Sequence, residues 1–250
     1  TRNDDNEIFI TSFLRNMGVL VPKTFYVKVK NKEQYTKYIF QENLKKEFLE
    51  ANNLIEGPIF EGHENIAESS KFFRLARLTN DEWIKDSQTK IFTSIMAMSD
   101  INILYLKDPT INIKSIKKPK TEIFHQDPSF FIDEENKQFN LYEAFAFALG
   151  ATHNLTRDDR KYYFDPIYGT FMPLYYDGRA KILNFDLKKL VYDYNKDHKR
   201  TLNTLIDNPS VTAPAKDGAL DAINLLNKIN KVKLLDELNQ RRLIQLFVLT

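Results

Sequence analysis

One segment, residues 150–178, constrains the fold of this chain more than any other. An apolar helical stretch ends at Gly150 and runs into a polar loop that reaches Asp159, and two aromatic-rich strands joined by a turn follow. The second strand delivers Asp177, directly before Gly178. Because a hairpin returns the chain to its starting point, its two ends can bring these carboxylates to one metal ion. Asp and Gly are also common turn residues, so an interpretation of both sites as plain turns stays open.

The composition is that of a globular protein of 250 residues, with 42% hydrophobic and 13% aromatic side chains. The formal net charge of +2 does not favour nucleic acid or an anionic membrane surface as a partner. The chain has no cysteine, which excludes disulfides and thiol catalysis. No apolar run approaches the length of about 18 residues that a membrane-spanning helix needs. Since the chain lacks an initiator Met, we expect a fragment, and a targeting signal could have preceded it.

Hydrophobic periodicity predicts an α+β fold. Residues 4–18 have the spacing of an amphipathic helix, whereas residues 24–30 alternate in the manner of a strand. A second strand is expected over 37–41. Further helices are expected over 43–51, 71–78 and 86–99, and over most of the chain after 187, including 218–249. A loop is expected over 52–70. The strands of the hairpin are expected over 161–165 and 170–176. Pro173 indicates that the last of these strands is bulged or lies at a sheet edge.

The loop before the hairpin can be aligned with the catalytic loop of protein kinases, His-Arg-Asp-Leu-x-x-x-Asn. In this alignment Asn154 stands where the catalytic Asp belongs, and Asp159 stands where the metal-binding Asn belongs. Asp159 and Asp177 would together bind magnesium. An amide cannot accept a proton as a carboxylate does, so His153 is the obvious substitute base. The alternative is that His153 is structural and bonds to nearby backbone.

Two glutamates stand where a kinase contacts its nucleotide. Glu7 shares a helical face with Ile10 and Leu14, so we expect it to point inward, as does the kinase glutamate that pairs with the ATP-binding lysine. Alternatively, Asp4 and Glu7 form a capping box at the helix start. Glu42 ends the second strand, where a kinase places its adenine-binding hinge, and it could contact the nucleotide. Equally, Glu42 could be an acidic residue that precedes a helix and needs no ligand.

Together these stretches resemble the spore-coat protein H (CotH) kinase family, a divergent branch of the protein-kinase-like fold. The resemblance rests on Asp5 to Arg15 with Pro22 to Val29, on Ile39 to Glu42 with Lys46 to Glu50 and Glu56 to Ile59, and on Thr152 to Gly178. It implies a two-lobed protein with a truncated N-lobe. Residues 1–50 would be the remainder of that lobe, with a helix, two strands and the hinge. Residues 51–250 would form a mainly helical C-lobe that carries the catalytic-loop hairpin at 150–178.

The resemblance further implies that ATP and Mg²⁺ are bound and that Ser or Thr residues of a coat or surface protein are phosphorylated. Asp177 would be the metal aspartate, Asp159 the second metal ligand and Glu7 the helix glutamate. The chain departs from the family at Asp159, where relatives carry Asn, and at Asn154, where active members carry Asp. The second departure favours an inactive, pseudokinase-type binding or structural module. A magnesium-dependent hydrolase that uses Asp158, Asp159 and Asp177 is a third interpretation.

Overall fold

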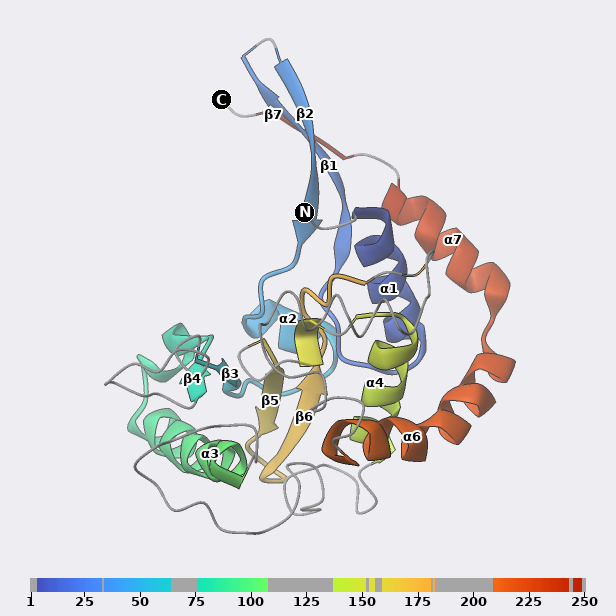
Figure 1. The fold of residues 1–250 in the computed structure, drawn as a ribbon. Helices are drawn as coiled ribbons and strands as arrows, with labels where there is room; N and C mark the ends of the chain where they lie inside the picture. The colour runs from blue at the N-terminus through green and yellow to red at the C-terminus, as the bar shows by residue number, and fades with distance from the viewer. Residues whose placement is uncertain are drawn as a thin grey trace.

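The computed structural model describes residues 4–32, 34–63, 76–107, 137–151, 153–155, 159–180, 182, 209–242 and 245–248. These residues form helices and two small, mainly antiparallel sheets, so the chain belongs to the α+β class, as predicted (Figure 1). The helices are α1 (Asp4–Asn16), α2 (Lys46–Ala51), α3 (Gln88–Lys107), α4 (Lys137–Ala148), α6 (Pro209–Lys228) and α7 (Lys231–Arg242), with short 3₁₀ turns η2 (Asp81–Ile84) and η4 (His153–Leu155).

The first sheet is built around β1 (Thr24–Asn31). On one side β1 pairs antiparallel with β2 (Gln34–Gln41), and on the other it pairs parallel with β7 (Gln245–Val248). Figure 1 shows the tip of the β1–β2 hairpin reaching away from the helices. The predicted helix over 218–249 is therefore wrong at its end, because the apolar residues of β7 extend along β1 instead of continuing α7.

The second sheet has the strand order β4-β3-β5-β6. Its strands are β3 (Ile59–Gly62), β4 (Ala76–Leu78), β5 (Lys161–Asp165) and β6 (Thr170–Leu174). The predicted β5–β6 hairpin is confirmed, and β6 lies at the edge of the sheet, as Pro173 indicated. Pro173 has no amide hydrogen, and an edge strand needs a partner on one side only.

Two expectations in the middle of the chain are wrong. The loop expected over 52–70 contains β3, and the helix expected over 71–78 contains β4; residues 64–75 lie outside the described residues. Both strands are short and take their partners from elsewhere in the sheet, so neither shows a local period. The helix expected over 86–99 is confirmed and extends as α3 to Lys107. Residues 183–208 also lie outside the described residues.

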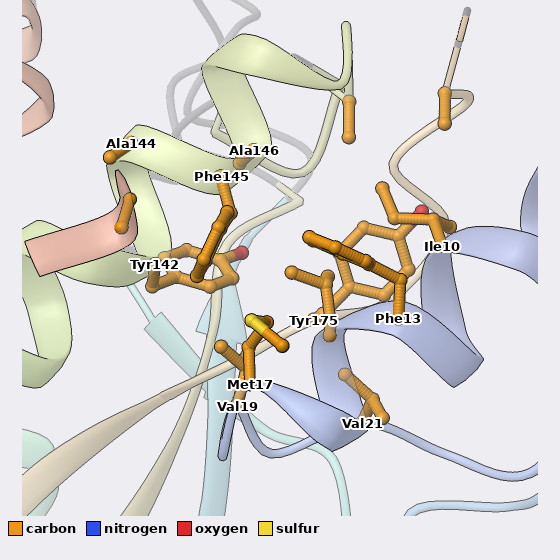
Figure 2. Close-up of a cluster of buried hydrophobic side chains, with 14 of the residues drawn as sticks. Ile10, Phe13, Met17, Val19, Val21, Tyr142, Ala144, Phe145, Ala146 and Tyr175 are labelled. Carbon is orange, nitrogen blue, oxygen red and sulfur yellow. The ribbon is translucent and has the colours of Figure 1, made fainter. Parts of the chain in front are cut away.

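A buried cluster joins the first helix to the hairpin region (Figure 2). Phe13 of α1 meets Phe145 of α4 edge to face, with 5.3 Å between the ring centroids. Such a pair adds about 0.5–1.5 kcal/mol beyond the burial of its surface. Tyr175, which follows β6, is fully buried in the same cluster. Consequently α1, α4 and the chain after β6 share one core, which fixes their relative positions.

Candidate functional site

The loop that carries the candidate catalytic residues starts at a glycine C-cap. Gly150 has a φ of 64°, and the amide of Ala151 donates to the carbonyl of Ala146 at 2.8 Å. This left-handed residue ends α4 and redirects the chain toward η4. Residues 152 and 156–158, and with them Asp158 of the hydrolase hypothesis, lie outside the described residues.

Asn154 is fully buried, and its Nδ2 atom donates a hydrogen bond of 2.6 Å to the hydroxyl of Tyr142 on α4. Burial raises the pKa of Tyr142 well above its ordinary value, so this phenol stays protonated. Asn154 thus stands in the predicted loop but is turned toward the helix core. An amide held in this way offers no basic group to a substrate.

A buried ion pair supports this loop. The Nη1 atom of Arg160 lies 2.6 Å from Oε1 of Glu143, and both side chains are almost completely excluded from solvent. Burial raises the pKa of the Glu143 carboxyl, and the Arg160 charge opposes that shift. Arg160 also donates through Nε to the carbonyl of Leu155 at 2.8 Å. Arg160 therefore connects α4 to the turn that contains Asn154. Sequence reasoning missed this role, although an Arg beside a predicted metal ligand was the available signal.

His153 and Asp159 come together across the loop. The Nε2 atom of His153 is 3.4 Å from Oδ2 of Asp159, and both side chains are partly exposed. The amide of His153 donates to the carbonyl of Gly178 at 3.3 Å. This bond connects the loop directly to the residue after Asp177. The loop before the hairpin and the chain after it are therefore bonded to each other at His153 and Gly178.

Gly178 is required by close packing. A Cβ atom at this position would lie 2.6 Å from Cε2 of Tyr175 and 2.8 Å from the Cβ of Ala151. Any larger residue would push the chain after β6 away from the loop. Its neighbour Asp177 has a φ of 51°, a left-handed conformation that Asp tolerates better than most residues. Asp177 therefore lies directly before a tightly packed glycine.

Glu7 faces this same segment, and its predicted inward direction is confirmed. Its side chain is 2% exposed and accepts hydrogen bonds from the Tyr175 hydroxyl at 3.0 Å and from the Ala180 amide at 3.4 Å. The neighbouring Asn6 donates through Nδ2 to the carbonyl of Ala180 at 2.9 Å. The first turns of α1 are therefore bonded to the chain on both sides of Asp177.

Lys161 is a charged residue that sequence reasoning missed. On β5 it stands opposite Glu61 of β3, and its ammonium group pairs with that carboxylate. The ammonium also lies 5.0 Å from the ring centroid of Tyr176. Burial lowers the pKa of Lys161 to about 8, and the Asp177 carboxylate opposes the shift. A cation thus lies within the electrostatic reach of Asp177.

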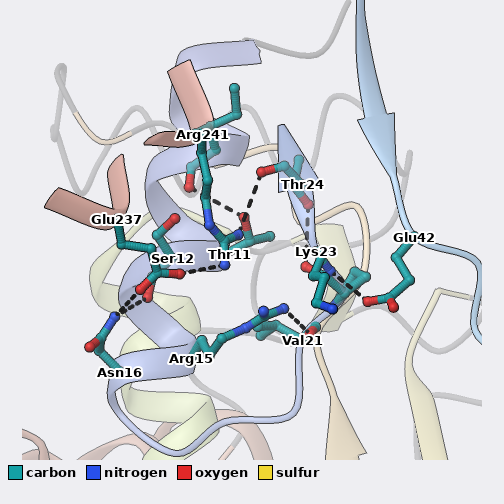
Figure 3. Close-up of polar contacts among 12 residues, drawn as sticks. Thr11, Ser12, Arg15, Asn16, Val21, Lys23, Thr24, Glu42, Glu237 and Arg241 are labelled. Carbon is teal, nitrogen blue, oxygen red and sulfur yellow. Dashed lines mark hydrogen bonds and ion pairs between the residues drawn. The ribbon is translucent and has the colours of Figure 1, made fainter. Parts of the chain in front are cut away.

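Glu42 belongs to a different cluster, at the base of the β1–β2 hairpin (Figure 3). Its Oε2 atom accepts a 2.9 Å hydrogen bond from the amide of Lys23. Arg15 of α1 and Arg241 of α7 are near enough to interact with its charge. Burial is the main cause that lowers the pKa of both arginines. The negative charge of Glu237 opposes this lowering in each case. The described contacts of Glu42 are therefore to protein groups of this cluster.

Two of the predicted ligands have the chemistry that magnesium prefers. Asp159 and Asp177 offer hard carboxylate oxygens, and magnesium usually takes one or two carboxylates together with phosphate oxygens and water. Among the described residues, no three His, Cys, Asp or Glu side chains are grouped so that they could hold a metal ion. The pair could therefore serve magnesium only if a ligand supplied further oxygens.

Comparison of the chain with protein-family models and with curated proteins finds no match. None of the helices in the described part of the chain combines the length and hydrophobicity needed to cross a bilayer.

Proposed function

We propose that this protein is a kinase-like phosphotransferase of the CotH type, which moves the γ-phosphate of ATP to a Ser or Thr hydroxyl of a surface or coat protein. The observation that carries the proposal is the buried bond between Glu7 and the segment around Asp177. In kinases a helix glutamate and a metal-binding Asp must be in place together. Here the two elements that carry these residues are part of one packed unit.

In this proposal Asp177 and Asp159 would hold a magnesium ion, which would neutralise charge on the phosphates of ATP. The hydroxyl oxygen of the acceptor attacks the γ-phosphorus atom, and the bond from that atom to the bridging oxygen of ADP breaks. His153 takes the hydroxyl proton. Its imidazole lies beside the Asp159 carboxylate, with 3.4 Å between Nε2 and Oδ2.

A second function has one specific observation in its favour. Asn154 replaces the expected catalytic Asp and is buried with its amide bonded to Tyr142. This arrangement suits a pseudokinase-type module, which would keep the fold and bind partners without phosphoryl transfer. Since positioning and charge neutralisation supply most of the acceleration in kinases, loss of the base weakens catalysis without necessarily removing it.

The deciding experiment incubates the intact protein with radiolabelled ATP, Mg²⁺ and casein, beside an Asp177→Ala variant. The matched control is Asp81→Ala, which removes an exposed acid in the η2 turn. We expect label transfer by the wild type and by the control, and none by Asp177→Ala.

Each other outcome has a defined meaning. Magnesium-dependent ATP binding in calorimetry without transfer would support the pseudokinase module. Absence of both transfer and binding would overturn the nucleotide hypothesis and leave Asp177 as a turn residue. Transfer that persists in Asp177→Ala would overturn the role given to that carboxylate.

A further inference from the structure

The β1–β2 hairpin ends in an open edge. Within the described part of the sheet, β2 is the outer strand, because β1 pairs with β2 on one side and β7 on the other. Most side chains of β2 are exposed on both faces, including Tyr35 at 48%, Tyr38 at 52% and Phe40 at 43%. Aromatic side chains exposed along an unpaired edge favour the addition of another strand.

The two faces of this edge differ in chemistry. One face carries lysines: Lys28 and Lys30 lie over the ring of Tyr35, with nitrogen-to-centroid distances of 4.8 and 5.6 Å, and Lys37 lies 3.3 Å from the ring centroid of Tyr26. These residues project to the same side because side chains alternate along each strand and pair across the register.

The opposite face is apolar. The ring of Phe40 packs against that of Phe25 at a tilt, with 4.8 Å between the ring centroids, and Tyr38 lies two positions before Phe40 on the same side. A strand added beside β2 would therefore place alternate side chains against the face that carries Lys37, with Lys28 and Lys30 behind it on β1, and against the aromatic rings of the other face. The geometry selects a partner strand whose residues alternate between acidic and apolar.

The register also identifies which backbone groups face outward. Asn31 and Gln34 flank a two-residue turn, which makes them a hydrogen-bonded pair. Bonded and non-bonded pairs then alternate along an antiparallel ladder, so the amides at positions 36, 38 and 40 face β1. The amides of Tyr35, Lys37 and Ile39 face the open edge.

We propose that the open edge of β2 binds an extended segment of a partner protein, with alternating acidic and apolar side chains, as an additional strand. A second copy of this chain suits the edge poorly. A two-fold axis between two β2 strands would set the two lysine-bearing faces side by side, and like charges across strands are destabilising. An acidic segment meets the lysines with opposite charge, and its backbone completes the ladder. The inference does not depend on phosphoryl transfer.

The test measures binding of a short fluorescein-labelled peptide that alternates Glu with Val or Phe to the intact protein, by anisotropy. The matched peptides carry Lys in place of Glu, or have the same composition with the acids in one block. We expect the alternating acidic peptide to bind at least about tenfold more tightly than either. Lys37→Glu should weaken binding about tenfold. Lys85→Glu, an exposed lysine away from the sheet, should leave binding unchanged.

Hydrogen exchange distinguishes strand addition from unspecific charge attraction. The bound peptide should protect the amides of Tyr35, Lys37 and Ile39, whereas the amides facing β1 should be protected already. Lys37→Pro removes one outward amide and no bond to β1, so it should abolish binding while the folded hairpin persists. Outward amides already protected in the free protein, equal binding of all three peptides, or binding unaffected by Lys37→Pro would each overturn the proposal.

Discussion

Tyr175 donates a hydrogen bond of 3.0 Å to Glu7, which lies 168 positions earlier in the chain, and both side chains are buried. Burial, followed by the charge of Glu7, raises the pKa of Tyr175 well above its ordinary value, so the phenol remains a donor. The same carboxylate accepts from the Ala180 amide. Glu7 therefore holds the two sides of Asp177 in place, whether or not a nucleotide binds.

We predict that Tyr175→Phe lowers the free energy of unfolding by about 1–3 kcal/mol, because it removes one donor from a buried carboxylate. Urea denaturation measures the change. The matched control is Tyr168→Phe, which alters a side chain that is 73% exposed in the hairpin turn and should leave stability within about 0.5 kcal/mol of the wild type. Equal stability of both variants would contradict the structural role given to this bond.

The Glu143–Arg160 pair leads to a second prediction. Arg160→Met leaves a buried carboxylate without its counter-charge and should cost about 3–5 kcal/mol. The double variant Glu143→Met/Arg160→Met should be more stable than either single variant, because it leaves no uncompensated buried charge. By contrast, Lys46→Met removes an exposed pair with Glu56 and should cost about 1 kcal/mol or less. Strictly additive losses in thermal or urea unfolding would show that the two charges are not coupled.

Elements with a strong local period were predictable from the sequence. The stripe through Ile10 and Leu14 indicated both α1 and the inward direction of Glu7, and alternation over residues 24–30 indicated β1. Short strands were not predictable, because β3 gains its partner from β5 about a hundred positions later, at Ile59 and Tyr163. The local sequence pattern of a short strand does not indicate which distant strand it pairs with.

The candidate site likewise has a part that was predictable from the sequence and a part that was not. The loop and the hairpin identified Asn154, His153, Asp159 and Asp177 as neighbours along the chain. The neighbours across the fold were not visible in the sequence. Lys161 meets its partner Glu61 only through the β3–β5 register, and the hydrogen bond from Asn154 depends on how the loop packs against α4. The periodicity of a sequence does not predict side-chain partners that are brought together by tertiary contacts.

A third prediction concerns the ionisation of Lys161, whose pKa is about 8 in the folded protein. A lysine in the unfolded chain has a pKa of about 10.4. The unfolded chain therefore binds more protons between these values, so this residue should make stability rise as the pH increases from about 8 to ~10.4. Lys161→Met should flatten the rise. Nitrogen-15 NMR of the lysine side chain gives the midpoint directly. A midpoint above that of free lysine would mean that the charge of Glu61 outweighs burial.

The last prediction tests whether the missing carboxylate limits catalysis. Asn154→Asp restores the residue type that kinases use as the base at this loop position. The Tyr142 hydroxyl, 2.6 Å from the Asn154 amide nitrogen, can rotate its hydrogen toward the new carboxylate, so the variant should fold with a loss of about 1–2 kcal/mol. If the proposed function holds and the new carboxylate turns from Tyr142 toward the acceptor hydroxyl, phosphoryl transfer to casein should rise by about 10²–10⁴-fold, the range of general-base catalysis.

Two comparisons make the Asn154→Asp result interpretable. Asn154→Ser removes the amide without supplying a carboxylate, and it should leave transfer at the level of the wild type. Combining Asn154→Asp with Asp177→Ala should abolish the gain, because the base acts only on a substrate positioned by the metal site. If Asn154→Asp folds and binds ATP but gains no activity, the base is not what limits this protein. The binding-module function would then be the better account of Asn154 and its bond to Tyr142.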